Sequence, residues 1–274
     1  MNLKPLLSSL AIGAAVISSM AATNDLKVNV GKPGAPIQPT MYGIFFEDIN
    51  YAADGGLYAE KIINRSFEFP QPLMGWRASG SVEVRTDGAP FDRAPHYVRL
   101  APSGHPHKHT AIENEGFFGV SVERGKEYRL SLWGRADGND TARIRVEIAD
   151  PASMGETHTL AKADIRILPG EWRRYEVMLK PSKSVERGRL RIFLVHPDHA
   201  VDLEHISLMP TDTWKGRRNG LRADLVEKLA DLRPGVFRFP GGCIVEGTDL
   251  ASRYQWKNTV GPVENRPVNE NRWH

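Results

Sequence analysis

Apolar and polar residues alternate with a period of two through the middle of the chain, from about residue 75 to about residue 210. Since successive side chains of a strand point to opposite faces, this period indicates strands with one buried face. Turn sequences such as Asp137-Gly138-Asn139 and Pro169-Gly170 separate the runs. Short strands with turns between them predict an antiparallel β-sandwich that contains no helix of any length. The apolar positions are Tyr128, Leu130, Leu132, Ile144, Val146, Ile148, Tyr175, Val177, Leu179, Leu190, Ile192 and Leu194.

The segment before this region has a different pattern. Met41–Phe46 is a continuous apolar run, which is typical of a strand buried on both faces of a parallel sheet, and it ends at Glu47-Asp48. A further strand is predicted over Leu26–Val30. After the turn at Gly55-Gly56, the spacing of apolar residues predicts a helix over Leu57–Glu68.

The segment after the sandwich changes to a helical period at about residue 214. Asn219 is a candidate N-cap for this helix, and Pro234-Gly235 would end it. Val236–Phe239 then predicts a short strand, followed by the tight turn Pro240-Gly241-Gly242-Cys243. This strand and Met41–Phe46 therefore resemble consecutive strands of a parallel α/β sheet. The apolar face of the helix is formed by Leu221, Leu225, Val226, Leu229 and Leu232.

The first residues have the composition of a cleavable secretory signal. Met1–Ala22 carries one positive charge, Lys4, then an apolar run of small residues and a small-residue exit. A membrane anchor would need about 18 or more uninterrupted apolar residues, and Ser8 and Ser9 interrupt this run. We therefore expect an exported protein, periplasmic or extracellular.

These patterns divide the chain into four parts. We expect a signal peptide at 1–22, an α/β segment at 23–74, the sandwich at 75–212, and a second α/β segment at 213–274. The fold class is α/β plus all-β, with the sandwich inserted between the pieces of the parallel sheet.

Composition narrows the function. The chain is 41% hydrophobic and 25% charged, with a formal net charge of +3 that falls to about +2 when Lys4 leaves with the signal. Arginines are interleaved with acidic residues, which argues against a nucleic-acid-binding face. Cys243 is the single cysteine, so no internal disulfide can form, and an exported protein would keep this thiol either buried or functional.

Polar residues follow both predicted parallel strands. In such folds, functional groups gather just past the carboxyl ends of the strands. Glu47-Asp48 follows the first strand, and Gly241-Gly242 with Cys243 follows the second. Arg238 lies inside the second strand, where its charge needs a partner, and Glu47 could supply one if the two strands are neighbours. Glu47-Asp48 as a solvated loop and Gly241-Gly242 as a simple turn remain alternatives.

Two long motifs in the chain resemble a known enzyme family. They are Met41–Glu60 with Asn64–Phe69, and Arg238–Gly247 continued by Tyr254–Pro262 and Arg266-Pro267. Both are similar to the opening of α-L-arabinofuranosidases of glycoside hydrolase family 51. The middle region, with Asn114–Gly119 and Trp133, resembles the carbohydrate-binding sandwich (jelly-roll) that one branch of the family carries. The resemblance covers essentially the whole chain after the signal.

The resemblance implies the first part of a (β/α)8 barrel, and an enzyme that removes terminal non-reducing α-L-arabinofuranosyl residues with retention of configuration. Glu47 and Cys243 would contact the sugar, and Arg238 would support them. The substrate would be an arabinan or arabinoxylan. Neither a cofactor nor a metal is expected, nor a nucleic-acid or membrane partner after signal cleavage. The full-length enzyme could form an oligomer.

The catalytic residues are not assigned within this chain. Retaining hydrolysis needs two carboxylates about 5–5.5 Å apart, and in the family both are glutamates on later barrel strands. We expect them beyond His274, so this chain should be an N-terminal fragment that is inactive alone. Glu246, Glu264 and Glu270 are not taken as substitutes.

Two other interpretations stay open at this point. One is a carbohydrate-binding protein without catalysis, in which the sandwich is the part that folds. The other concerns His105, His107 and His109, which could bind a metal in a strand but which Pro106 and Lys108 make typical of a solvated loop.

Among the large aromatic residues of the sandwich, we expect most to be core and one or two to face a ligand; they are Trp76, Phe117, Phe118, Trp133 and Trp172.

Overall fold

The computed structural model describes residues 26–104, 109–152, 158–195 and 199–268. The predicted signal peptide Met1–Ala22 lies outside the described residues, as do His105, His107 and Glu270. The chain forms two compact units, 1–38 and 39–274. In the first unit the predicted strand Leu26–Val30 is absent and its apolar side chains are exposed. A strand needs a hydrogen-bonding partner, and none of the residues described in this unit pairs with it.

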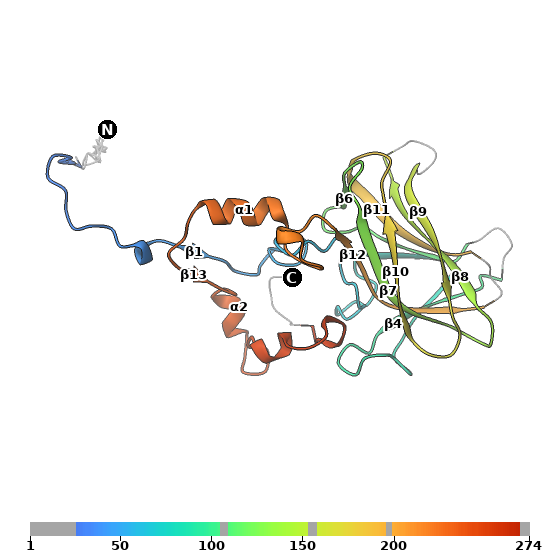
Figure 1. Ribbon diagram of the computed structural model, residues 1–274. Helices are drawn as coiled ribbons and strands as arrows, with labels where there is room; N and C mark the ends of the chain where they lie inside the picture. The colour runs from blue at the N-terminus through green and yellow to red at the C-terminus, as the bar shows by residue number, and fades with distance from the viewer. Residues whose placement is uncertain (1–25, 105–108, 153–157, 196–198, 269–274) are drawn as a thin grey trace, which may run out of the picture. The chain divides into compact units, whose positions relative to one another are not determined.

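The second unit contains the predicted antiparallel sandwich (Figure 1). One sheet has five strands in the order β10 (Arg173–Leu179), β7 (Tyr128–Ala136), β12 (Val201–Pro210), β4 (Tyr97–Ala101) and β3 (Ser81–Arg85). The other has the order β2 (Trp76–Ser79), β5 (Ala111–Asn114), β11 (Val185–Leu194), β8 (Ala142–Asp150) and β9 (His158–Ile167), with β6 (Val120–Val122) also paired to β11. The described part of Trp76–Pro210 contains strands and no helix, which confirms the period-two prediction.

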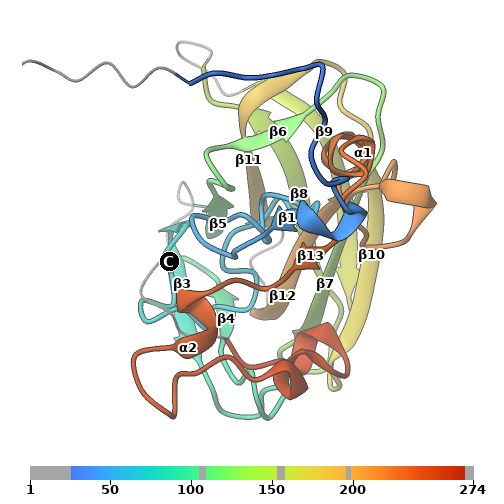
Figure 2. The same ribbon diagram turned by 90° about the vertical axis from the view of Figure 1, so that its left-hand side faces the viewer.

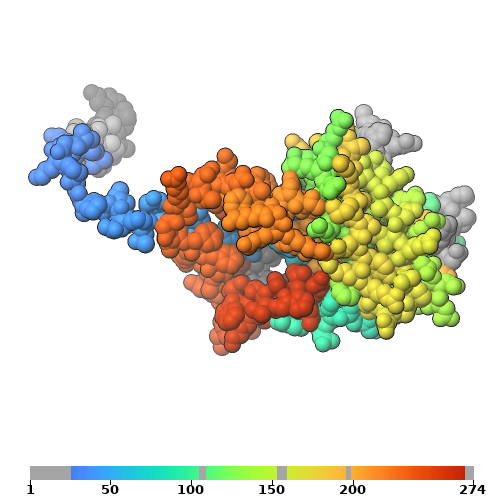
Figure 3. Space-filling model, in the orientation of Figure 1, coloured from blue at the N-terminus to red at the C-terminus, as the bar shows by residue number. Residues whose placement is uncertain are grey.

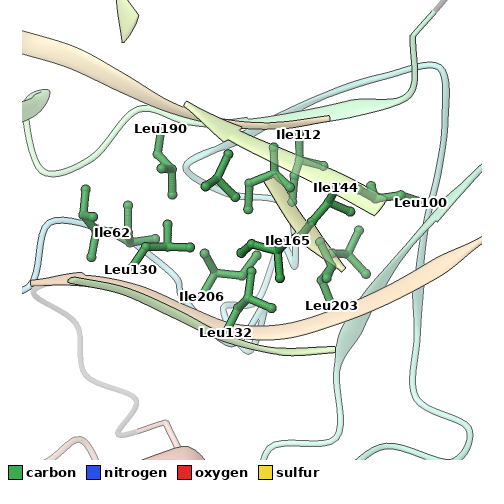
Figure 4. Packing of buried hydrophobic residues seen from close by; sticks show 14 of the residues in the cluster. Ile62, Leu100, Ile112, Leu130, Leu132, Ile144, Ile165, Leu190, Leu203 and Ile206 are labelled. Carbon is green, nitrogen blue, oxygen red and sulfur yellow. The ribbon is translucent and has the colours of Figure 1, made fainter. Parts of the chain in front are cut away.

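The core lies between the two sheets (Figure 4). Ile112, Ile144 and Leu190 of one sheet point toward Leu130 and Leu132 of the other. The predicted inward positions on β7, β8 and β11 are buried, because alternation places them all on one face of their sheet. Each such aliphatic side chain contributes about 1.5–3 kcal/mol when it leaves water.

Two residues from before the sandwich also belong to this core. Ile62 and Phe67 are fully buried in the same cluster, and the Phe67 ring packs on that of Trp76 at 5.3 Å between centroids. The Trp76 indole donates a hydrogen bond to the carbonyl of Asn64 at 2.9 Å. The chain just before β2 is thus part of the sandwich core.

The predicted helix over Leu57–Glu68 is wrong, although its apolar residues are buried. The backbone forms turns here, because its N–H groups bond to distant partners. Lys61 donates to the carbonyl of Leu208 at 3.0 Å, and Ile63 to the side chain of Asn114 at 3.3 Å. These contacts with the sandwich replace the bonds that a helix would make within itself.

A parallel strand pair forms the α/β part of the second unit. β1 (Ile44–Phe45) pairs with β13 (Phe237–Arg238), as the sequence predicted (Figure 2). The burial prediction for Met41–Phe46 is wrong, since Phe45 is 54% exposed and Met41 69%. Among the described residues, no third strand joins this two-stranded pair. The described residues show this pair and helix α1, and not a closed barrel.

Helix α1 (Ala223–Asp231) occupies the predicted position but begins differently. Its N-cap is Arg222 without a side-chain capping bond, not Asn219, which has a positive φ of 50°. The helix has no buried residue, and Figure 3 shows it at the surface in orange. The remaining short helices are η1 (Pro39–Met41), η2 (Trp214–Gly216), α2 (Cys243–Glu246), η3 (Trp256–Thr259) and η4 (Val263–Asn265). In the described part of the chain, no helix is long and apolar enough to cross a membrane.

Candidate functional site

Glu47 lies where the two parallel strands end. Backbone pairing continues past β1, since the Phe46 N–H donates to the carbonyl of Arg238 at 2.9 Å and the Asp48 N–H to that of Pro240 at 3.0 Å. The Glu47 carboxylate therefore meets the turn after β13. Its Oε1 accepts hydrogen bonds from the N–H groups of Gly242 at 2.9 Å and Ile244 at 3.3 Å. The sequence predicted that the residues following the two strands lie together at the carboxyl ends of those strands, and this geometry agrees with the prediction.

Gly241 is required for this contact. A Cβ at this position would lie 2.5 Å from Glu47 Cγ, and the backbone has φ +150°. Any larger residue would push the carboxylate away from the turn. Gly241-Gly242 is thus more than a simple turn, because it lets the backbone approach Glu47.

The environment of Glu47 favours its charged form. The N–H groups of Gly242 and Ile244 lower the pKa of Glu47, and the positive charge of Arg238 acts in the same direction. The side chain is half-buried and stays in contact with solvent. Glu47 can thus present a carboxylate oxygen to a hydroxyl group of a ligand.

Arg238 is not paired as the sequence suggested. Among the described residues it forms no ion pair with Glu47; its guanidinium lies 4.4 Å from the centre of the Phe45 ring. Because β13 is exposed, the charge is solvated and needs no buried partner. The cation–π contact places Arg238 beside the site.

Cys243 and Asp48 have different places at this edge. Cys243 is the first residue of α2 and is exposed, so the alternative of a buried packing thiol is wrong. The Asp48 carboxylate accepts the N–H of Ala53 at 2.9 Å and holds the following loop. Glu47, Arg238 and Cys243 therefore come together at the end of the strand pair, while Asp48 is turned to its own loop.

A second polar cluster, missed in the sequence, joins the segment after β1 to the sandwich. Glu60 is buried, and its Oε1 accepts the N–H groups of Ile62 at 3.1 Å and Leu208 at 2.9 Å. Its Oε2 accepts bonds from Arg65 at 3.2 Å and from the hydroxyl of Ser207. Burial raises the pKa of Glu60, which the Arg65 charge opposes. A glutamate among Ile62, Ile63 and Phe67 was the available signal, hidden by the assumption of a helix.

No metal centre is found in the described part of the chain. It contains no group of three or more His, Cys, Asp or Glu residues placed to hold an ion. His105 and His107 lie outside the described residues, so the histidine alternative is not tested.

Two family models of known proteins match separate parts of the chain. A family model described as "Carbohydrate binding domain" matches residues 59–199, and one described as "Alpha-L-arabinofuranosidase 1 domain" matches residues 228–274. The sandwich is thus of the carbohydrate-binding class.

Relatives and a solved structure extend this match. An extracellular exo-alpha-L-arabinofuranosidase of Streptomyces chartreusis is 40% identical over 90% of this chain and 30% of its own length. Alpha-L-arabinofuranosidase 1 of Arabidopsis thaliana is 36% identical over 85% of this chain and 36% of its own length. The structure of the arabinose-bound MgGH51 α-L-arabinofuranosidase matches with a TM-score of 0.79 and 31% identity over 88% of this chain and 40% of that one.

The chain therefore belongs to the carbohydrate-binding domain family over residues 59–199, within a sequence that corresponds to the N-terminal part of family 51 α-L-arabinofuranosidases. It spans about a third of the length of the curated relatives that it matches.

Proposed function

We propose that this chain supplies the N-terminal part of an exported α-L-arabinofuranosidase that hydrolyses terminal non-reducing α-L-arabinofuranosyl residues with retention. The observation that carries the proposal is the Glu47 carboxylate held by two backbone N–H groups at the end of a parallel strand pair. Relatives named arabinofuranosidases support the reaction, and one named extracellular supports export together with the signal-like Met1–Ala22.

In this proposal β1, α1 and β13 are the first elements of a (β/α)8 barrel. The limits 23–74, 75–212 and 213–274 stay those expected from the sequence, although the sandwich core also takes in Ile62 and Phe67. The carboxyl ends of β1 and β13 would face the sugar, as in parallel barrels generally. Glu47 would accept hydrogen bonds from sugar hydroxyls, with Cys243 beside it and Arg238 as support. The substrate would be an arabinan or arabinoxylan, and the whole protein could form an oligomer.

The reaction itself needs a carboxylic acid that protonates the leaving group and a carboxylate that attacks the sugar. We assign neither role to a residue of this chain. The part proposed for these residues is to bind and orient the arabinosyl ring, which contributes to catalysis by fixing the position of the reacting bond.

Binding of methyl α-L-arabinofuranoside to the 274-residue chain tests this proposal. We expect a calorimetric or NMR titration to give binding that Glu47→Gln weakens about tenfold or more, because a charged acceptor is lost. Glutamine keeps an oxygen for the N–H of Gly242, so the turn should persist. Glu246→Gln, which changes an exposed carboxylate on α2, is the matched control.

Equal affinity of the wild type and Glu47→Gln would reject Glu47 as a substrate contact. In a parallel assay with an aryl α-L-arabinofuranoside, we expect the 274-residue chain to stay at background. Turnover at rates typical of glycosidases would show that the catalytic pair is already present.

A further inference from the structure

The second unit has a cavity that none of Glu47, Arg238 and Cys243 lines. Its volume is about 390 Å³, within the usual range of small-ligand sites. Three parts of the chain form its walls: the segment Gly55–Lys61, the sandwich around β6 and the start of β7, and the beginning of α1. Both β6 and β7 lie within residues 59–199, the part that matches the carbohydrate-binding domain.

Charged side chains of both signs line this cavity. Its described lining holds three cations and five carboxylates. Lys126 lies between Glu123 at 3.0 Å and Asp212 at 2.9 Å, and Arg222 forms two hydrogen bonds with Asp224, at 3.1 and 2.6 Å. These carboxylates oppose an anion, and the described chain contains no group of three or more His, Cys, Asp or Glu residues placed to hold a metal ion. The lining therefore suits an uncharged ligand.

Three polar groups of the lining remain available to such a ligand. The Lys61 ammonium, the Ser121 hydroxyl and the Glu227 carboxylate form no hydrogen bond or ion pair with any residue that the structure describes. Nearby carboxylates stabilise the charge of Lys61 at longer range, so this ammonium needs no anion and can donate to a hydroxyl group. An ammonium donates, a carboxylate accepts and a hydroxyl does both. This combination matches the hydroxyl groups of a sugar.

The same cavity has an aromatic wall. Phe117 lines it next to Gly55, where a Cβ would lie 2.2 Å from the Phe117 ring. Tyr51 also holds this ring edge-on, with 5.2 Å between the two centroids. A fixed aromatic ring is an apolar surface on which a sugar ring can pack.

Phe118 adds a second ring next to the cavity. It does not line the cavity, and its side chain is 85% exposed. It too lies edge-on to Tyr51, with 6.2 Å between centroids. Its backbone has φ 59°, where glycine would be less strained, so stability alone does not account for a phenylalanine here.

This loop carries the exposed aromatic surface of the sandwich. Among the described residues of 59–199, no other phenylalanine, tyrosine or tryptophan is as exposed as Phe118. The outward positions of β8 and β11 are instead mostly charged. A sugar chain that packs on aromatic rings therefore finds them at the Phe117–Phe118 loop and not on the outer face of these two strands.

We propose that this cavity and Phe118 bind an uncharged pentose polysaccharide chain. One sugar residue packs on Phe117 among the polar groups of the cavity, and the next packs on the Phe118 ring. The site holds the chain without cleaving it, and so goes beyond the proposed function. Its position rests on the cavity and on the carbohydrate class of the sandwich; only the choice of a pentose chain rests on the proposed function.

NMR titration of the Glu47→Gln chain with linear arabinopentaose and with xylopentaose tests this site, because that variant lacks the charged acceptor of the Glu47 site. We expect saturable binding, and the pentaose that binds more tightly identifies the chain. Adding Phe118→Ala should weaken this binding at least about tenfold, because a packing surface for one sugar ring is lost. Phe118→Tyr should retain the affinity within a few-fold.

A second variant blocks the cavity itself. Ser121 lines it from an exposed position on β6, so Ser121→Trp should fill the cavity without disturbing the fold and should abolish binding. Trp256→Ala is the matched control, since Trp256 is an exposed aromatic residue that does not line the cavity. It should leave the affinity for the pentaose unchanged.

Any of four results would overturn the proposal. They are no saturable binding of either pentaose, equal affinity with and without Phe118→Ala, unchanged affinity in Ser121→Trp, and a steep loss of affinity at high salt, which would indicate recognition of charge. In the chain that keeps Glu47, Phe118→Ala should leave the affinity for methyl α-L-arabinofuranoside unchanged, whereas Glu47→Gln weakens it. The two proposals therefore fail separately.

Discussion

Three glutamates of this chain differ because their immediate neighbours differ. Glu47 is held by backbone N–H groups and Glu60 by an arginine, a serine and N–H groups. Glu204 on β12 is fully buried, and neither carboxylate oxygen has a hydrogen-bond partner among the described residues. Burial raises the pKa of Glu204 to about 10, and the negative charges of Glu68 and Glu264 add to the effect.

The raised pKa of Glu204 makes stability depend on pH. The folded chain keeps this carboxyl protonated at neutral pH, while the unfolded chain releases the proton near the ordinary glutamate pKa of 4.5. The contribution of Glu204 to the free energy of unfolding is therefore fully present below pH 4.5, and it is lost as the pH rises toward 10. Glu204→Gln should increase the free energy of unfolding at pH 8 by on the order of 1–3 kcal/mol and change it little at pH 4.

Urea unfolding of both proteins across this pH range measures the effect. Glu186→Gln, an exposed carboxylate on β11, serves as control and should stay within about 0.5 kcal/mol of the wild type. His205, next to Glu204, has a pKa lowered to about 3 by burial and by the charge of Arg65. Its own contribution is lost as the pH falls below 6.5, opposite in direction to that of Glu204. A gain from Glu204→Gln that is the same at pH 4 and pH 8 would contradict a buried, protonated Glu204.

At the scale of elements, the turns from Tyr58 to Phe69 depend on one buried side chain. Glu60→Ala removes the acceptor for the N–H groups of Ile62 and Leu208 and the partner of Arg65. We expect this change to lower the free energy of unfolding by about 3–5 kcal/mol, the usual cost of breaking a buried ion pair.

Thermal or urea unfolding gives this value. Glu227→Ala on the exposed face of α1 is a suitable comparison and should change stability by about 0.5 kcal/mol or less. A loss below about 1 kcal/mol for Glu60→Ala would show that water or a rearranged chain replaces the glutamate.

The sequence predicted some elements well and others poorly, for a physical reason. The strands β7, β8, β10 and β11 alternate over most of their length, and each pairs with neighbours inside one sandwich, so local pattern and tertiary structure agree. The helix over Leu57–Glu68 failed because its N–H groups are bound by Leu208 and Asn114, which lie far away in the sequence. At the site, Glu47 and Gly241 could be paired from strand order. The contact between Arg238 and Phe45 could not be predicted, because it depends on which face of the β1–β13 pair is exposed.

At the scale of the whole molecule, the sandwich core reaches beyond the predicted limit at residue 75. Ile62 and Phe67 fill it, and Asn64 accepts the hydrogen bond of the Trp76 indole. A chain of residues 59–212 should therefore unfold cooperatively, whereas residues 75–212 should be less stable by several kcal/mol, since removal of one such side chain costs about 2–5 kcal/mol.

Urea unfolding followed by tryptophan fluorescence compares the two shortened chains. In 75–212, Trp76 should also emit at longer wavelength, because the residues that cover it are gone. Equal stability of the two chains would place the true limit near residue 75 and show that Ile62 and Phe67 are dispensable.

Three phenylalanine rings cluster at the parallel pair of β1 and β13: Phe46, Phe237 and Phe239 lie with all three centroid distances between 5.7 and 6.4 Å. Phe237 and Phe239 are each about half exposed, at 49% and 57%, and in the described residues no third strand joins the pair. Such a surface attracts another copy or an apolar dye. Light scattering from this polypeptide should therefore rise with its concentration.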